Sequence, residues 1–247
     1  MFAAPAWSVV IPAYNEAARL PAYLKEVVAY FDGRDQPYEV LVVDDGSRDA
    51  TGALVRELAG VHACVRLHAL PANRGKGFAV RTGMMAARGA LRLMADADGA
   101  TPIVEVKRLE AAIQAGADLA VGSRALPDPS VVVRARAHRT LAGQVFSRLV
   151  RALGVSGVVD TQCGFKLFRA AVADDLFPAL RTDGFGFDVE LVLLAQHRGY
   201  RIAEVPINWT DQPGSKVGVL KDGPRMLAQI VAACLRLARS RNPRREA

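Results

Sequence analysis

Short apolar runs alternate with amphipathic segments along the first half of the chain. Five runs rich in β-branched and aliphatic residues predict buried strands, and apolar residues recurring every three or four positions between them predict helices. The predicted strands are 8–12, 39–44, 65–69, 90–95 and 119–122, and the predicted helices are 17–31, 50–59, 77–87 and 102–115. This alternation predicts an α/β fold with a mostly parallel central sheet flanked by helices.

The pattern changes after residue 124. Two prolines at 127 and 129 interrupt it, and the segment 131–153 is then basic and amphipathic at helical spacing. Further along, the pattern predicts strands at 165–168 and 201–205 and helices at 187–197 and 224–238. We therefore assign residues 1–220 to one α/β domain and residues 221–247 to a C-terminal amphipathic basic helix and tail.

Acidic residues follow three of the predicted strands. Glu16 comes after the first, Asp44 and Asp45 end the second, and Asp96 and Asp98 follow the fourth. Ligands of open parallel sheets bind beyond the carboxyl ends of the strands. Two carboxylates one residue apart suit a hard cation such as Mg²⁺, which takes one or two carboxylates together with water and substrate phosphates. The sequence therefore predicts a metal-assisted phosphate site at this edge.

Other phosphate-binding patterns fit less well. The run NRGKG at 73–77 resembles a phosphate loop, but the GxxxxGK[ST] spacing of P-loop proteins is absent. No GxGxxG follows the first strand, which argues against a dinucleotide-binding site. An alternative role for the DDGSRD run at 44–49 is to cap the following helix, which suits Ser47 or Asp49. Capping would account for only one of its aspartates.

The charge balance favours a polyanionic partner. The 247-residue chain carries a formal charge of +7, which suits nucleic acid, anionic lipid or phosphorylated small molecules. Aromatic residues make up only 6% of it and do not alternate with basic ones, which disfavours nucleic acid. Its three cysteines show no metal-ligand spacing and predict reduced thiols in a cytosolic protein. We expect no secretory leader, and no apolar run approaches the roughly 20 residues that span a bilayer.

Several sequence blocks resemble family 2 glycosyltransferases of the GT-A fold. These are VVIPAYNE at 9–16, VVDDGSRD at 42–49, NRGKGFAV at 73–80 and DADGATP at 96–102. The blocks DTQCGFKLF at 160–168, FDVEL at 187–191 and NWTDQPGSKV at 208–217 resemble the branch of dolichyl-phosphate β-glucosyltransferases. The resemblance covers about residues 7–220. It implies inversion at the anomeric carbon, a UDP-glucose donor, a polyprenyl-phosphate acceptor, and Mg²⁺ or Mn²⁺ as cofactor.

The resemblance also implies roles for individual residues. Asp45 would accept a hydrogen bond from the base, and Asp96 and Asp98 would hold the metal. A departure occurs at Ala100, where mannose-transferring relatives often carry Gln, so coordination would rely more on water or diphosphate oxygens. We expect the donor to be bound by Pro12, Tyr14, Glu16, Val43, Asp45, Lys76, Asp96, Ala97 and Asp98, and the acceptor phosphate by the basic residues Arg124, Arg139, Lys166 and Lys216.

The family pattern invites Asp160 first and Asp188 second as the catalytic base. A phosphate monoester has its second pKa near ~6, so an acceptor phosphate is largely ionised at neutral pH. General-base assistance, worth about 10²–10⁴ for a hydroxyl, would then add little. The acceptor instead needs cations that bring two anionic partners together.

Two alternatives remain open at this stage. One is a family 2 enzyme with a soluble or other glycan acceptor, and the other, disfavoured above, is a basic nucleic-acid-binding protein. The segments 131–153 and 224–238, the latter with an arginine-rich tail, predict peripheral attachment at the inner face of a membrane. The competing interpretation is that both segments pack on the sheet. The oligomeric state is not predicted.

Overall fold

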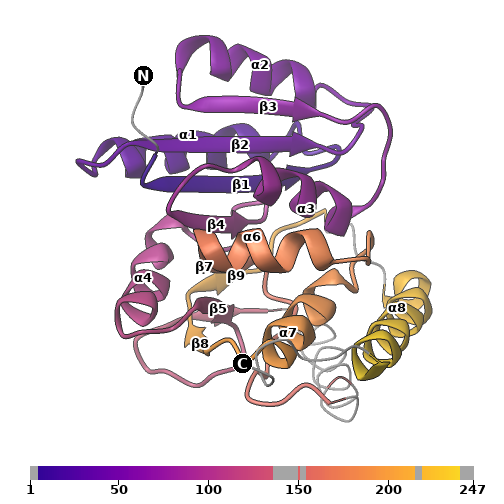
Figure 1. Ribbon diagram of the computed structural model, residues 1–247. Helices are drawn as coiled ribbons and strands as arrows, with labels where there is room; N and C mark the ends of the chain where they lie inside the picture. Colours follow the sequence, from indigo (N-terminus) through magenta and orange to yellow (C-terminus); the bar gives the residue numbers. More distant parts are fainter. Residues whose placement is uncertain (1–4, 136–149, 151–153, 215–218, 240–247) are drawn as a thin grey trace.

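The computed structural model describes residues 5–135, 150, 154–214 and 219–239. The strands of its main sheet are β1 (Trp7–Ala13), β2 (Tyr38–Asp44), β3 (Val65–Ala69), β4 (Leu91–Ala95), β5 (Leu119–Ser123), β7 (Phe165–Arg169) and β8 (Ile202–Pro206). Within the described residues they form a sheet in the order β3-β2-β1-β4-β7-β5-β8 (Figure 1). All pairings are parallel except those of β7, which runs antiparallel to β4 and β5. The expected mostly parallel sheet is confirmed.

Helices cover both faces of the sheet (Figure 1). One face carries α1 (Leu20–Asp32), α2 (Thr51–Val61), a 3₁₀ turn η1 (Ile103–Glu105) and α4 (Val106–Gln114). The other carries α3 (Lys76–Ala86), α6 (Ala170–Ala179) and α7 (Phe187–His197), and α8 (Val219–Arg239) packs against α7. Alternate residues of each strand point to opposite faces of the sheet. Val9 and Ile11 therefore pack with the layer of α1, α2 and α4, and Val10 packs with the layer of α3, α6 and α7.

Two helices differ from the sequence prediction. Residues 170–179 form α6, although the pattern predicted no element there. Its inward residues, among them Val172 and Leu176, have helical spacing, but Pro178 inside the helix and two adjacent aspartates obscure the signal. Helix α8 begins at Val219 and includes Pro224, which the sequence had suggested as its first residue.

The basic segment 131–153 also differs from expectation where it is described. Its first residues do not form a helix but a short strand, β6 (Val133–Arg134), parallel to β9 (Trp209–Thr210). The Asn208 side chain accepts the Val132 N–H (2.7 Å), which holds this strand beside β9. Most of the remaining segment, including Arg139, lies outside the described residues.

Helix α3 approaches the sheet closely at Gly83. A Cβ atom there would lie 2.4 Å from Val10 Cγ1 and 2.8 Å from Val43 Cγ2. We expect Gly83→Ala to lower the free energy of unfolding by about 1–3 kcal/mol through overpacking. Gly60→Ala in α2, where a Cβ would meet nothing within 4 Å, should raise it by about 0.4–1 kcal/mol. Urea unfolding of both variants checks this, and stabilisation by Gly83→Ala would contradict the close packing.

Candidate active site

The predicted functional residues meet at one edge of the sheet. The carboxyl ends of β2, β1, β4 and β5 lie there, and the antiparallel β7 brings its N-terminal end to the same edge. Asp45 follows β2, Glu16 follows β1, Asp96 follows β4, Asp160 precedes β7, and Arg124 follows β5. Neighbouring strands are about 4.8 Å apart, so four steps from β2 to β5 span about 19 Å.

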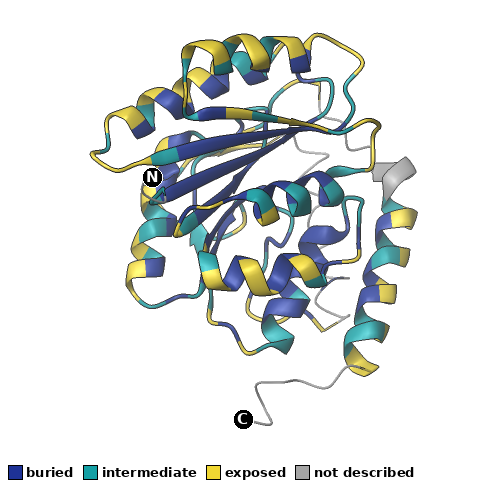
Figure 2. Cartoon of the chain, turned by 45° about the horizontal axis from the view of Figure 1, so that its top comes forward, coloured by how far each residue is buried: buried dark blue, intermediate teal, exposed yellow. Residues whose placement is uncertain are grey.

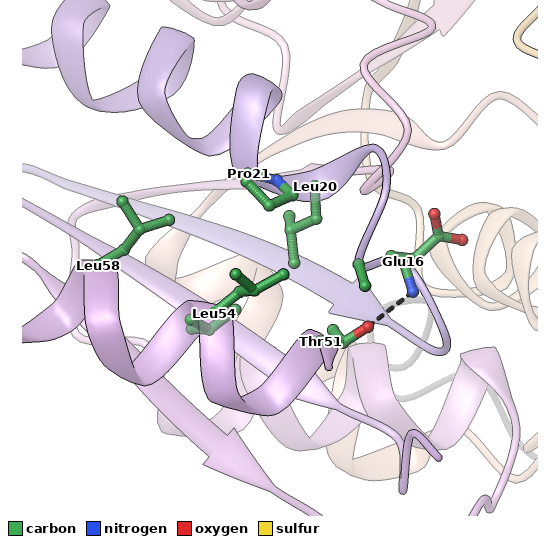
Figure 3. A pocket seen from close by; sticks show the side chains of 8 residues that line it. Glu16, Leu20, Pro21, Thr51, Leu54 and Leu58 are labelled. Atoms are coloured by element: carbon green, nitrogen blue, oxygen red, sulfur yellow. Dashed lines mark hydrogen bonds between the residues drawn. The ribbon is translucent and has the colours of Figure 1, made fainter. Parts of the chain in front are cut away.

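The loop after β1 is fixed to the start of α2. Asn15 adopts a left-handed conformation (φ 52°), and its N–H donates to Ser47 Oγ (2.9 Å). The Glu16 N–H donates to Thr51 Oγ1 (2.8 Å), above a small apolar pocket between α1 and α2 (Figure 3). The Glu16 carboxylate turns away from the apolar side chains of that pocket (Figure 3). These main-chain contacts direct it towards Arg19.

Arg19 connects three parts of the edge and was not predicted. Its guanidinium donates to both oxygens of Glu16 (2.8 and 2.6 Å) and to the main-chain oxygen of Pro213 (3.0 Å). Its Nη1 also lies 3.7 Å from Asp98 Oδ2. Opposite charges three residues apart at the start of a helix are a sequence signal for such a pair. Only the fold shows that the arginine also reaches Asp98 and the segment before α8.

Asp45 holds the NRGKG loop. Its carboxylate accepts hydrogen bonds from Asn73 Nδ2 (2.9 Å), Arg74 N–H (2.7 Å) and Gly75 N–H (2.9 Å). Burial raises the pKa of this carboxyl above its usual value, although the two amides act in the opposite direction. The contact between Asp45 and a nucleotide base stays a prediction, to which the structure adds this role in ordering the loop.

The two glycines after Arg74 permit close packing against the segment before α7. A Cβ on Gly75, whose φ is +105°, would lie 2.4 Å from the Asp183 oxygen. A Cβ on Gly77 would lie 2.4 Å from the Thr182 oxygen. The Phe78 N–H donates to the Asp183 oxygen (3.1 Å). This approach places the intervening lysine, residue 76, beside the beginning of α7.

The Asp-x-Asp pair is already contacted by cations of the chain. Lys76 Nζ lies 2.6 Å from Asp96 Oδ1, and the Asp98 carboxylate accepts the Ala100 N–H (3.1 Å). Burial lowers the pKa of Lys76, but Asp96 and neighbouring carboxylates outweigh it and hold that pKa well above its usual range. Burial and then the charge of Asp96 raise the pKa of Asp98. Gly164 admits the Asp96 carboxylate, because a Cβ there would lie 2.0 Å from Oδ2.

This donor set suits a hard divalent cation. The Asp96 and Asp98 side chains keep 39% and 26% of their surface exposed, so their oxygens remain accessible. The part of the chain that the structure describes contains no group of three or more potential ligands among His, Cys, Asp and Glu. Two carboxylates with substrate phosphates and water make a normal Mg²⁺ coordination shell. The residues present therefore fit the predicted metal.

The predicted bases pair with two of the predicted acceptor cations. Arg124 donates from Nε and Nη2 to Asp160 (2.7 and 2.8 Å), and fully buried Lys166 pairs with Asp188. Burial alone would raise the pKa of Asp160, but Arg124 outweighs it and lowers that pKa. Burial raises the pKa of Asp188 despite the opposing charge of Lys166. The catalytic and acceptor-binding roles of these residues stay predictions.

The other predicted site residues are divided between the edge and the undescribed parts. Pro12 and Val43 are buried register partners at the ends of β1 and β2. Tyr14 is half-buried beyond β1, and Ala97 is buried within the Asp-x-Asp turn. Arg139 and Lys216 lie outside the described residues.

Solved structures with the same fold include two phosphoglycerate glycosyltransferases. One is glucosyl-3-phosphoglycerate synthase from Mycobacterium tuberculosis in complex with Mn²⁺, UDP-glucose and phosphoglyceric acid, with a TM-score of 0.69 and 20% identity over 93% of this chain and 80% of that one. The other is mannosyl-3-phosphoglycerate synthase from Rubrobacter xylanophilus, with a TM-score of 0.70 and 20% identity over 95% and 74%. At this identity the similarity shows the fold, and it confirms the expected GT-A fold.

Sequence relatives are closer. The chain is 39% identical over 236 residues to dolichyl-phosphate β-glucosyltransferase of Dictyostelium discoideum, covering 91% of this chain and 72% of the relative. It is 41% identical over 226 residues to the Homo sapiens protein of the same name, covering 85% and 69%. Residues 8–177 match the family described as Glycosyl transferase family 2. The chain therefore belongs to glycosyl transferase family 2.

Proposed function

We propose that this glycosyltransferase transfers glucose from UDP-glucose to a polyprenyl phosphate, with inversion, at the cytoplasmic face of a membrane. The names of the sequence relatives support the transferred sugar and the lipid-phosphate class of acceptor. The UDP-glucose and Mn²⁺ of a protein with the same fold support the donor and the divalent cation. Asp45 follows β2, Asp96 follows β4 and Arg124 follows β5. This order supports a binding mode with the nucleoside near β2, the diphosphate near β4 and the acceptor phosphate near β5.

The observation that carries the acceptor class is the pairing of both candidate bases. Asp160 forms a bidentate ion pair that lowers its pKa, which makes it a weak base. The pKa of Asp188 is raised, but its carboxylate is buried and engaged by Lys166. A hydroxyl acceptor requires a group that removes its proton, whereas a phosphate monoester is already ionised near neutral pH. The geometry therefore favours a phosphate oxygen as the nucleophile over a hydroxyl.

In the proposed reaction an acceptor phosphate oxygen attacks the anomeric carbon of glucose from the face opposite UDP. The bond between that carbon and the diphosphate oxygen breaks, UDP leaves with the electron pair, and the configuration inverts. A divalent cation held by Asp96 and Asp98 would neutralise charge on the departing diphosphate. Lys76 and Arg19 contribute fixed positive charge beside the same aspartates.

Helix α8 offers a surface for peripheral membrane contact. Its inner residues Met226, Ile230 and Ala233 are buried, whereas Val231 and Leu235 are 38% and 54% exposed. Arg239 ends the helix, and three more arginines follow in the sequence. An exposed apolar stripe next to arginines suits a helix lying among anionic headgroups, where each basic residue contributes about 1 kcal/mol. Across the ranges described, no helix combines the length and apolar character of a membrane span.

A transfer assay tests the proposed function. The protein with Mn²⁺, radiolabelled UDP-glucose and a short polyprenyl phosphate should yield label that extracts into organic solvent. GDP-mannose and UDP-N-acetylglucosamine serve as alternative donors, and 3-phosphoglycerate serves as a soluble acceptor. Label transferred to 3-phosphoglycerate but not to the lipid would move the protein to the soluble-acceptor class. Absence of transfer to either acceptor, with active relatives as positive controls, would reject the proposal.

Substitution at the metal site should separate chemistry from folding. We expect Asp98→Asn to lower transfer at least about 100-fold, because a metal interaction worth several kcal/mol at the diphosphate is lost. Mn²⁺-dependent UDP binding, measured by calorimetry, should fall with it while the melting temperature stays near wild type. Asp35→Asn, an exposed substitution near the opposite edge of the sheet, is the matched control. Near-normal turnover of Asp98→Asn at saturating Mn²⁺ would show that the metal assignment is wrong.

Vesicle sedimentation tests the membrane surface. Full-length protein should sediment with anionic vesicles at low salt and return to the supernatant as salt screens the arginines. Leu235→Asp should weaken sedimentation because it places a carboxylate on the apolar stripe. Val61→Asp, at a 76%-exposed valine at the end of α2, introduces the same charge elsewhere and should have little effect. An equal loss of sedimentation in both variants would show that net charge, and not the surface of α8, determines vesicle binding.

A further inference from the structure

Helix α8 makes polar contacts with the segment that leads into α7. Figure 2 shows buried residues along the side of α8 that faces the rest of the molecule. From this side Arg236 pairs with Glu190, and Gln229 Oε1 accepts the Gly186 N–H (3.3 Å). We propose that α8 is a positioning element of the active site, which holds the segment 181–190 and, through it, Lys76. This inference rests on the proposed role of Lys76 in binding the donor.

Glu190 is the first link in this arrangement. Its side chain is fully buried in α7, and its carboxylate accepts the N–H groups of Arg181 (2.9 Å) and Thr182 (2.7 Å). Arg236 Nη2 donates to the same carboxylate from α8. Burying the charge of a carboxylate is costly unless a cation and hydrogen-bond donors compensate it. Arg236 therefore supplies the counter-charge for the carboxylate that holds the main chain at residues 181 and 182.

Gln229 is the second link. A Cβ on Gly184 would lie 2.9 Å from Gln229 Nε2, and a Cβ on Gly186 would lie 2.9 Å from Gln229 Oε1. The Gln229 carboxamide therefore packs directly against the main chain at Gly184 and Gly186, within the segment 181–190. Two side chains of α8, spaced seven residues apart on one face, contact the same segment at separate points.

The segment then contacts the start of α3. The Thr182 and Asp183 oxygens lie against Gly77 and Gly75, and the Asp183 oxygen accepts the Phe78 N–H. Lys76 lies between these glycines and pairs with Asp96. An unbroken series of contacts therefore runs from α8 to the Asp-x-Asp pair. Energetic coupling between distant sites can be carried by packed contacts and hydrogen bonds of this kind.

Hydrogen exchange of the ligand-free full-length protein tests the proposal. Arg236→Gln should speed amide exchange in peptides covering residues 181–186 and also in those covering 76–80. Arg225→Gln removes the same charge from an exposed position of the same helix and should leave both peptides unchanged. Arg236→Lys keeps the cation and should restore much of the protection.

Donor binding supplies the second measurement. In the presence of Mn²⁺, Arg236→Gln should weaken UDP binding roughly 2- to 30-fold. In the transfer assay it should raise the KM for UDP-glucose while the KM for the acceptor changes less. A purely structural role for Arg236 would lower the melting temperature without this selective change.

Two results would overturn the proposal. Faster exchange at 181–186 without change at 76–80 would show that the series of contacts stops before Lys76. Unchanged UDP affinity in folded Arg236→Gln protein would show that the positioning does not reach the donor. If Arg236→Gln does not fold, Gln229→Ala, which removes no charge, takes its place with the same expected pattern. Failure of the wild type to bind UDP would instead reject the proposed function, and the exchange measurement would still decide whether α8 positions Lys76.

Discussion

Mutual repulsion of carboxylates at one edge of the sheet is the constraint on which this site depends. Acidic groups brought together at strand ends destabilise the fold unless cations or hydrogen-bond donors compensate them. Each acid here has a partner. The partners of Asp96, Asp160 and Asp188 come from other parts of the chain, Glu16 has Arg19 three residues further on, and Asp45 has the amides of the NRGKG loop. The result is a set of charges fixed before any ligand arrives, which lowers the cost of reorganisation during reaction. The ion pairs are Glu16–Arg19, Asp96–Lys76, Asp160–Arg124 and Asp188–Lys166.

The parts of the fold that depend on local pattern could be predicted from the sequence. The strands β1 to β5 follow from short apolar runs, and the edge that carries Asp45, Asp96 and Asp98 follows from the parallel arrangement. Helix α7 also matches its predicted bounds, Phe187–His197, because its apolar residues continue through every turn. Local pattern failed at α6, where Pro178 stands inside the helix.

Apart from Glu16–Arg19, the pairings within the site could not be predicted, because they join residues distant in sequence. Lys166 was expected to face an acceptor phosphate, and only the fold shows that Asp188 of α7 is its partner. The same holds for Glu190, whose partner Arg236 lies on the last helix. Spacing alone shows which residue types are available at an edge. It does not show which of them neutralise one another and which remain open to a ligand.

Strand β7 has a consequence for how the molecule is made. It lies between β4 and β5 in the sheet, yet both of those strands precede it in the chain. During synthesis the free edge of β4 therefore stays unpaired until residues 165–169 have left the ribosome. An unpaired edge is a template for other strands and a route to misassembly. Insertion of β7 joins β4 to β5 and completes the sheet. The same step brings the loop that contains Asp160 and Gly164 next to Asp96, at the carboxyl end of β4.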